Sequence, residues 1–560
     1  MKKLLILGFD GATWTLVRPL MEAGKLPNLA GLVDGGVHGP LRSVPNMRSA
    51  AAWTSFMTGT NPGKHGVYEF YERVPGEYQV RFVNGSWRRG LAFWEILGDE
   101  ARLAGGEPRR VGIANVPMTY PAGEVNGFLI AGLDAPGKES KGFTYPPGLI
   151  RNIESAVGEY ILEPGVTGMM VAGNEAGAEA ALLRSIDQRK KAFLHLMQEQ
   201  PWDLFVAVFR ETDTAHHCFW QYLEPEKVGR EVAADSPFRQ TIDKVYQRLD
   251  EALGEILGAL PADTVVMVMS DHGFSFRQYG TSCLNGLLER HGLLEFRSSG
   301  GGGGGLLKRA YRGVEGLLGR GAKEKLVRLF PKLRDRVQSR LFFSRIDWKK
   351  TRAYSDGVMP VVWINLKGRD PDGIVEPGAA YDAVVSEVTE ALLAARDVTT
   401  GRRVVEAVHH RDAIYEGACV EAAPDLLVEW KDDEPVLGLV PGDGGAAVMP
   451  EFPTGEFTVI TGEHRPDGIF VMQGPGVRSG EALEGLSIMD IAPTVLFGMG
   501  APVPADVDGR VMMQAFNAEY LEGKTLVKSE ELAGDGGRSD YQDDDAETIR
   551  DRLRDLGYIE

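Results

Sequence analysis

Three short apolar segments, each leading to an aspartate, are the feature that most constrains how this chain can fold. They are LLILGF before Asp10, LFVAVFRET before Asp213 and VVMVMS before Asp271. Short apolar runs of this kind are typical of strands that are buried on both faces of a parallel sheet. In an open α/β sheet, binding groups gather just beyond the carboxyl ends of the strands. We therefore expect the three aspartates to meet in one crevice.

The rest of the chain alternates between strand-like and helix-like patterns. Residues 175–200 have apolar positions at helical spacing and lead directly into the strand before Asp213. Residues 242–260 form a second amphipathic segment, which leads into the strand before Asp271. Alternation of this kind predicts an α/β fold with a mainly parallel central sheet and helices on both of its faces.

One region departs from this pattern. Residues 300–305 are six consecutive glycines, and residues 306–352 carry fifteen Lys or Arg against four Asp or Glu, with apolar residues at helical intervals. We interpret this region as an inserted helical cap, and an acidic, glycine-rich stretch at 531–547 as a loose linker. The expected organisation is a split α/β core over 1–298 and 350–515, a glycine-rich loop with the basic insert over 299–349, and an acidic linker with a short helix over 516–560. That final helix should dock through Ile549, Leu553 and Leu556.

The basic insert has two interpretations. Its charged face is either simply solvated, or it draws an anionic substrate or the surface of an anionic membrane toward the protein. The chain as a whole carries a formal net charge of −18. Because general nucleic-acid binding needs a basic footprint, we expect no nucleic-acid partner.

The cysteines and the apolar segments indicate a cytoplasmic protein. Cys218, Cys283 and Cys419 are widely spaced, which fits neither a disulfide scaffold nor a thiolate metal site. The apolar start of the chain breaks at Gly8 and Asp10, so we interpret it as the first strand rather than a secretion signal. No stretch approaches the roughly 18 uninterrupted apolar residues of a membrane span.

Seven residues of metal-ligand type are scattered over the chain: Asp10, Ser49, Asp213, His217, Asp271, His272 and His464. Taken singly, Asp10 fits a helix cap, Asp213 with His217 fits a solvated pair, and His464 fits a hydrogen-bonded loop residue. Gathered together without cations, the three carboxylates would repel one another and raise each other's pKa. Divalent metal ions remove this conflict.

The ligands divide into two sites. One site is richer in oxygen ligands and consists of Asp10, Asp271, His272 and the Ser49 hydroxyl. The other is richer in nitrogen ligands, consists of Asp213, His217 and His464, and has an open position. Mixed carboxylate and imidazole ligands suit zinc in the first place and manganese in the second. Two such ions roughly 3.5–4 Å apart form a clamp for in-line displacement at phosphorus.

Six motifs in a fixed order resemble those of the alkaline phosphatase superfamily, and within it the type I phosphodiesterase and nucleotide pyrophosphatase-like phosphohydrolases. They are LILGFDG (5–11), RSAAAWTSFMTGTNPGKHG (48–66), ETDTAHHCFW (211–220), SDHGF (270–274), GEHRPDGIF (462–470) and IMDIAPTVL with DGR (488–510). The resemblance implies a three-layer α/β/α core and a two-metal site. It also implies that Ser49, four residues before Trp53, is the nucleophile and forms a covalent phosphoseryl intermediate.

Two features depart from the nucleotide pyrophosphatases. Those enzymes carry a threonine nucleophile and, five residues after the histidine that corresponds to His65, an asparagine that contacts phosphate; here the residues are Ser49 and Phe70. The RSAA context is closer to the seryl branches, which hydrolyse or transfer phosphomonoesters. Ser49 also fits a helix N-cap, and the two roles are compatible.

Five residues beside these motifs are candidates for substrate contact: Arg48, Asn61, His65, Phe70 and Arg465. Arg48 and Arg465 flank ligand positions and are the nearest donors for phosphate oxygens, although each also fits a structural role. Asn61 and His65 fit loop-fixing roles as well. The substrate itself should be a small phosphoester.

Three functions follow from these observations. The first is hydrolysis of phosphodiesters or phosphomonoesters, and the second is a phosphomutase that returns the phosphoryl group to another hydroxyl of the substrate. The third is a non-catalytic protein that has kept the fold, which the complete ligand set disfavours. A sulfatase is disfavoured too, because Ser49 lies in RSAAAW and not in a CxPxR or SxPxR motif.

Overall fold

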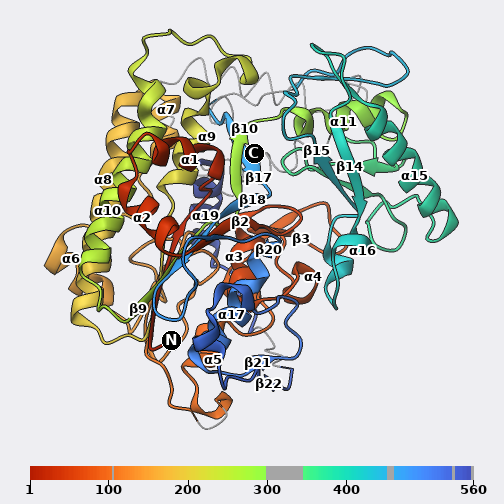
Figure 1. Cartoon of the computed structure of the whole chain (residues 1–560). Helices are drawn as coiled ribbons and strands as arrows, with labels where there is room; N and C mark the ends of the chain where they lie inside the picture. Colours follow the sequence, from red (N-terminus) through yellow and green to blue (C-terminus); the bar gives the residue numbers. More distant parts are fainter. Residues whose placement is uncertain (104–105, 298–344, 451–458, 532–536, 556–560) are drawn as a thin grey trace.

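The computed structural model shows two unequal lobes (Figure 1). It describes residues 1–103, 106–297, 345–450, 459–531 and 537–555. Most of the insert expected over 299–349, with its glycine run and predicted helical cap, therefore lies outside the described residues.

The larger lobe is built on a ten-stranded sheet of order β19-β2-β18-β9-β1-β8-β5-β6-β7, with β20 also paired to β2. The strands from β9 to β6 in this order run parallel, whereas β18 is antiparallel to both neighbours and β7 is antiparallel to β6. Their bounds are β1 Lys3–Phe9, β2 Val37–Arg42, β5 Val111–Val116, β6 Gly127–Ala131, β7 Thr144–Tyr145, β8 Leu204–Phe209, β9 Thr264–Met269, β18 Asp467–Gln473, β19 Glu481–Ala482 and β20 Leu486–Ser487. The mainly parallel sheet is as predicted.

The three strands that lead to the aspartates are neighbours. β1 lies between β8 and β9, and Gly8 pairs with Val208 on one side and with Met269 on the other. All six residues of both β8 and β9 are buried, as expected for strands covered on both faces. The carboxyl ends of these strands therefore lie side by side, and the aspartates that follow them converge.

Helices cover both faces of the sheet (Figure 1). One layer contains α1 (Trp14–Glu22), α2 (Pro27–Gly35), α8 (Glu175–Glu199), α9 (Glu211–Leu223) and α10 (Thr241–Gly258), and the other contains α3 (Ser49–Thr58), α5 (Phe93–Leu97) and α17 (Ile491–Met499). Helices α8 and α10 match the two helices predicted from the sequence. All ten residues of α3 are buried, because α5 and α17 pack over it.

The smaller lobe has its own antiparallel sheet of order β11-β12-β15-β14, flanked by α11 (Gly280–Arg290) and α15 (Ala379–Ala394). Its strands are β11 Ala353–Tyr354, β12 Val361–Ile364, β14 Val405–His410 and β15 Leu426–Trp430. Residues 352–368, within the expected core segment 350–515, contribute β11 and β12, which pair within this lobe and not with the main sheet. Burial gives a strand its apolar pattern and does not determine which sheet the strand joins.

The remaining elements connect or flank these sheets. A ribbon of β10 (Gly273–Phe276) and β17 (Gly462–Arg465) stands beside the main sheet. The others are α4 Pro62–His65, α6 Leu149–Val157, α7 Val166–Val171, α16 Arg411–Ile414, α18 Ala518–Leu521, α19 Asp543–Asp555, β3 Tyr71–Arg73, β4 Val80–Phe82, β13 Arg396–Asp397, β16 Leu439–Val440, β21 Val503–Pro504 and β22 Lys528–Ser529. In the described part of the chain, no helix combines the length and apolar character required to cross a membrane.

The C-terminal helix α19 docks on the larger lobe. Ile549 and Leu553 are buried as predicted, whereas Leu556 lies outside the described residues. Tyr541, within the segment expected as a loose linker over 531–547, makes two contacts with this lobe: its hydroxyl donates to the Asp134 carbonyl (2.6 Å), and its ring stacks on Tyr120. An aromatic side chain thus gives this acidic segment a contact that its overall composition does not suggest.

Candidate active site

Asp10 is the first residue after β1 and is held by three other segments. Its N–H donates to the Phe209 carbonyl (2.9 Å), and its carbonyl accepts the Thr212 hydroxyl proton (2.6 Å). The Trp53 indole N–H donates to Asp10 Oδ2 (3.2 Å). Gly8 permits this approach, because a Cβ there would lie 2.5 Å from the Trp53 ring. The segments around Asp10 and Ser49 are thereby packed together.

Gly11 makes the turn that follows Asp10. Its φ is +67°, and a Cβ would lie 3.0 Å from the Phe274 ring, so only glycine fits without strain. The Gly11 N–H donates to Asp271 Oδ1 (3.2 Å). This turn therefore joins the end of β1 to the end of β9.

The other ligands come from α9 and from the ribbon. Asp213 and His217 lie one turn apart at the start of α9, so both face the same side. Asp271 and His272 connect β9 to β10, and His464 on β17 lies opposite Phe274 of β10. The β10–β17 pairing is what carries His464 to the ends of the central strands.

Asp10, Asp271 and His272 form the first group of potential metal ligands. His272 Nε2 lies 3.3 Å from Asp271 Oδ2 and 3.8 Å from Asp10 Oδ1. The Ser49 hydroxyl lies 3.2 Å from the same nitrogen. This is the oxygen-richer set expected from the sequence.

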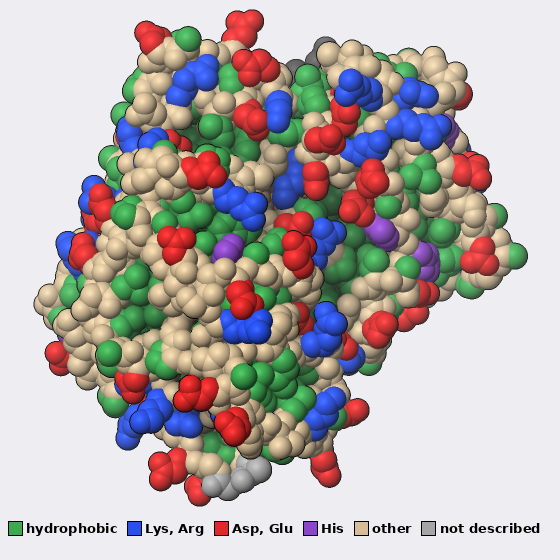
Figure 2. Space-filling model, in the orientation of Figure 1, with side chains coloured by type: hydrophobic (Ala, Val, Ile, Leu, Met, Phe, Trp, Pro, Cys, Tyr) green, Lys and Arg blue, Asp and Glu red, His purple; other side chains and the backbone are tan. Residues whose placement is uncertain are grey.

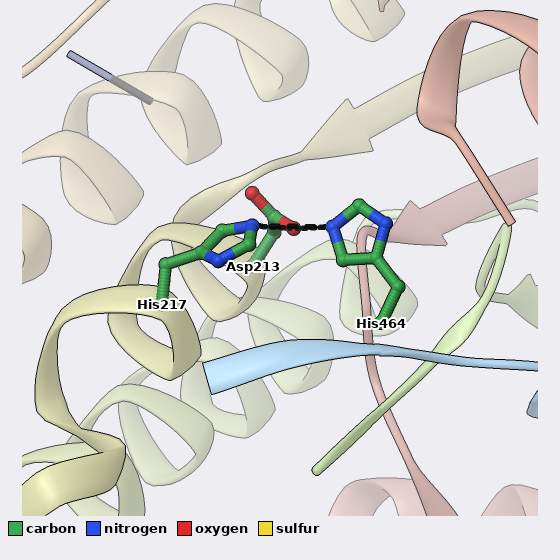
Figure 3. Close-up of side chains that lie close together, drawn as sticks. All are labelled: Asp213, His217 and His464. Carbon is green, nitrogen blue, oxygen red and sulfur yellow. Dashed lines mark hydrogen bonds and ion pairs between the residues drawn. The ribbon is translucent and has the colours of Figure 1, made fainter. Parts of the chain in front are cut away.

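Asp213, His217 and His464 form the second group (Figure 3). Asp213 Oδ1 lies 3.4 Å from Nε2 of each histidine. His217 donates its Nδ1 proton to the Gly462 carbonyl (3.0 Å), and His464 donates its Nδ1 proton to the Met47 carbonyl (2.7 Å). With its Nδ1 proton engaged in this way, each histidine turns Nε2 toward Asp213, and in a neutral ring this nitrogen carries the lone pair that binds a metal.

The contact between these two nitrogens shows that the second group suits a cation. His217 Nε2 and His464 Nε2 lie 3.1 Å apart. Neutral rings would bring two lone pairs face to face at this distance, and a cation shared between them would remove their repulsion. His272 donates its Nδ1 proton to the Gly273 carbonyl (3.0 Å), so its Nε2 is presented to the first group in the same way. A backbone acceptor that fixes the tautomer is typical of histidines that bind metal.

Burial and charge repulsion shift the pKa values of carboxyl groups in this cluster. Burial, followed by repulsion from Asp213, raises the pKa of Asp271 to about 7. Burial also raises the pKa of Asp10, with further contributions from Asp271 and Asp213. Among the described residues there is no hydrogen-bond partner for Asp10 Oδ1, Asp271 Oδ2 or either carboxylate oxygen of Asp213. Buried acceptors of this kind, with three Nε2 lone pairs between them, fit two divalent cations.

Ser49 is the first residue of α3, and Arg48 is the N-cap residue. The expected N-cap role of Ser49 is therefore wrong by one position, and the Arg48 side chain forms no cap hydrogen bond. The Ser49 side chain instead points to His272, as given above. N–H groups of a first helical turn have no acceptor within the helix and favour an anion at this end of α3.

Arg210 is a cation at this site that sequence reasoning missed. It follows β8 directly, and its guanidinium lies 4.0 Å from Asp10 Oδ2, 3.8 Å from Asp213 Oδ2 and 3.4 Å from Glu163 Oε2. Its side chain is buried, and its positive charge opposes the rise in the pKa of Asp10. Its position three residues before Asp213, at a strand end, was the available signal.

Comparison with known proteins places the chain in a family. The model of the family described as type I phosphodiesterase / nucleotide pyrophosphatase matches residues 4–434. The chain belongs to this family. As a type I phosphodiesterase / nucleotide pyrophosphatase family member it is a phosphoric ester hydrolase, and the resemblance to the alkaline phosphatase superfamily is confirmed. Among curated proteins, no sequence matches the chain.

Solved structures of low sequence identity are similar to the chain. Phosphonoacetate hydrolase from Sinorhizobium meliloti 1021, bound to phosphonoacetate, is 13% identical, with 88% of this chain and 94% of that chain covered and a TM-score of 0.50. Murine ectonucleotide pyrophosphatase / phosphodiesterase 5 is 12% identical (89% and 95% covered, TM-score 0.41), and alkaline phosphatase PafA is 13% identical (92% and 99% covered, TM-score 0.47). The first of these supports the predicted alkaline phosphatase-like fold.

The two candidate arginines of this family member are held by other protein groups. Arg48 pairs with the buried carboxylate of Glu69. Arg465 donates to the carbonyls of His464 and Phe276 (2.9 Å each) and lies 3.3 Å from Asp432. Because neighbouring residues of a strand face opposite sides, Arg465 points away from the side to which His464 contributes. Substrate contact by either arginine stays a prediction.

Two of the other three candidates, Asn61 and His65, hold loops in place. Asn61 caps α4 by accepting the Gly63 N–H (2.9 Å) and donates to the Ile414 carbonyl (3.1 Å). His65 accepts the Val67 N–H at Nδ1 and donates to the Ser55 hydroxyl from Nε2 (2.9 Å). Phe70 is buried. These contacts match the loop-fixing roles considered for Asn61 and His65, and contact of the three with substrate is untested.

Proposed function

We propose that this protein hydrolyses phosphoesters with two divalent metal ions and forms a covalent phosphoseryl intermediate on Ser49. The observation that supports this most is the arrangement of the Nε2 atoms. Those of His217 and His464 face each other at 3.1 Å beside Asp213, and that of His272 lies 3.2 Å from the Ser49 hydroxyl. The Ser49 hydroxyl therefore lies beside the first ligand set, which supports its role as the nucleophile.

Each ligand set would hold one ion. Asp10, Asp271 and His272 would bind the first, with the Ser49 hydroxyl as a further ligand, and Asp213, His217 and His464 would bind the second. When bound, divalent ions neutralise the carboxylates, favour the ionised forms of a hydroxyl and of a water, and stabilise charge on phosphoryl oxygens. Zinc suits these mixed ligands first and manganese second.

The chain itself provides the orientation. Helix α3 places Ser49 at its N-terminus, where the N–H groups of Ala50 and Ala51 have no partner within the helix and can donate to phosphoryl oxygens. The Ser49 oxygen attacks phosphorus, the bond to the leaving oxygen breaks, and water later releases phosphate from Ser49. Arg210 adds a fixed positive charge near Asp10 and Asp213.

The number of organic groups attached to phosphate distinguishes a diester from a monoester, and the identity of those groups decides whether the substrate is a nucleotide. Ser49 and Phe70 depart from the threonine and asparagine of the nucleotide pyrophosphatases, and Phe70 is buried in the core. These residues favour a substrate other than a nucleotide. Surface charge gives no further indication, because acidic and basic side chains are interspersed over the face shown in Figure 2.

The test uses metal-loaded protein with bis-p-nitrophenyl phosphate and p-nitrophenyl phosphate, in the presence of zinc, manganese or magnesium. Diester turnover that is lost in Ser49→Ala selects a phosphodiesterase, and monoester turnover that is lost selects a phosphomonoesterase. Ser155→Ala is the control, because Ser155 is an exposed serine on α6 whose hydroxyl bonds only to the Arg151 carbonyl among the contacts described. No turnover of either ester with any of the three metals would contradict the proposal.

A further inference from the structure

The segment that precedes Ser49 has an unusual backbone conformation. The Met47 N–H donates to the Val44 carbonyl (3.0 Å), which closes a turn with Pro45 at its second position. Proline suits that position because its ring fixes φ. Met47 follows with φ of +51°, a left-handed conformation that residues other than glycine seldom adopt. Such outliers are kept where the surrounding structure determines them, and they concentrate at functional sites.

This conformation directs the Met47 carbonyl to a predicted metal ligand. His464 donates its Nδ1 proton to this carbonyl at 2.7 Å. A second contact lies four residues earlier, where the Ser43 N–H donates to the Pro466 carbonyl (2.8 Å). The segment that leads to Ser49 and the segment that carries His464 are therefore joined at two points, one on each side of the turn.

We propose that Met47 is a positioning residue whose main-chain carbonyl, held by the left-handed backbone, fixes the tautomer and orientation of His464 and couples the nucleophile segment to the second ligand set. This inference rests on the proposed function. The backbone conformation of Met47 orients His464 in this proposal, and the half-buried Met47 side chain has no part in it. Loss of a partner of this kind typically costs about 10–100-fold in metal affinity or activity.

Three substitutions at this one position separate backbone from side chain. Met47→Gly removes the side chain and favours the left-handed conformation, Met47→Leu keeps a similar size without β-branching, and Met47→Val disfavours a positive φ. Zinc affinity is measured for both ions by competition with a chelator, together with kcat and KM for the better ester. We expect Met47→Val to weaken one of the two ions by about tenfold or more and to lower kcat by a similar factor. We expect Met47→Gly and Met47→Leu to stay within about threefold of the parent protein.

Two results would overturn the inference while leaving the proposed function in place: two ions bound with unchanged affinity in folded Met47→Val, or a loss in Met47→Gly as large as in Met47→Val. A parent protein that binds no zinc would instead contradict the proposed function itself.

A measurement on the parent protein covers the case in which Met47→Val does not fold. Nitrogen NMR of histidine-labelled protein, with the His464 signal assigned from His464→Asn, should show His464 with its proton on Nδ1 with and without zinc. A proton on Nε2 in the zinc-free protein would refute the role of the Met47 carbonyl.

Discussion

A buried ion pair behind the second ligand set gives a prediction of defined size. Arg189 on α8 lies 2.7 Å from Glu211, the first residue of α9, and the two side chains are 1% and 2% exposed. The Ser185 hydroxyl also donates to Glu211 (2.5 Å), and Arg189 donates to the Leu162 carbonyl (2.9 Å). Glu211 is two residues before Asp213, so this pair holds the turn of α9 that carries a predicted metal ligand.

Arg189→Met leaves the Glu211 carboxylate buried, with the Ser185 hydroxyl as its one remaining donor among the residues that the structure describes. Removing one partner of a buried pair costs about 3–5 kcal/mol, because the remaining charge is uncompensated. With an unfolding entropy of about 2 cal/mol/K per residue, this corresponds to a fall in Tm on the order of 3–4 °C if the chain unfolds as one unit. Zinc affinity of the second ligand set should fall as well.

The matched control is Arg184→Met on the same helix. Arg184 pairs with Glu159 (2.5 Å), but the side chains are 61% and 54% exposed, so the loss should stay below about 1 kcal/mol. Thermal unfolding of both variants, and of Arg189→Met combined with Glu211→Gln, measures the difference. Equal shifts for Arg184→Met and Arg189→Met, or a double variant no more stable than Arg189→Met alone, would refute this reasoning.

Three further predictions concern other parts of the molecule. Burial, with a smaller contribution from Arg88, lowers the pKa of His65 from 6.5 to about 3. Between pH 6.5 and about pH 3 the His65 ring is therefore protonated in the unfolded chain but not in the folded protein, so the free energy of unfolding falls as the pH falls. The free energy of unfolding should fall by about 2 kcal/mol between about pH 7.5 and about pH 5, and this loss should be absent in His65→Gln. Tm measured against pH compares the two proteins, and an equal slope in both would contradict the prediction. Removing divalent ions with a chelator should lower Tm, since an ion at about a hundred times its Kd stabilises by about 2.7 kcal/mol per site, and an unchanged Tm would contradict metal binding. Leu553→Ala should loosen α19 by about 2–5 kcal/mol, seen as faster proteolytic loss of the C-terminal helix, and unaltered protection would show that this contact is unimportant.

The convergence of Asp10, Asp213 and Asp271 could be predicted because it depends on a general property of parallel sheets. Apolar runs identified β1, β8 and β9, and the rule for strand ends placed the acids that follow them. The same reasoning did not locate His464. Its position depends on the pairing of β17 with β10, two short strands almost two hundred residues apart, and local patterns do not specify such pairing.

Other features depend on tertiary contacts that leave little trace in the sequence. In the sequence little distinguishes Arg210 from other arginines, because its role depends on the ends of β1 and β8 lying side by side. Met47 has a left-handed backbone although it is not a glycine, the residue type that would indicate such a conformation in a sequence. The run VVWI at 361–364 has the pattern of a core strand, yet it belongs to the smaller lobe, because the apolar pattern reports burial and not the choice of partner strand.

The most direct test of the proposed chemistry is to trap the intermediate. The metal-loaded protein is mixed with the better of the two nitrophenyl esters, quenched in acid during turnover and analysed by peptide mass spectrometry. We expect one phosphoryl group on the peptide that contains Ser49, absent from Ser49→Ala and from protein quenched before substrate is added. Sustained turnover with an unmodified Ser49 peptide at every quench time, or full activity of Ser49→Ala, would contradict a covalent phosphoseryl mechanism.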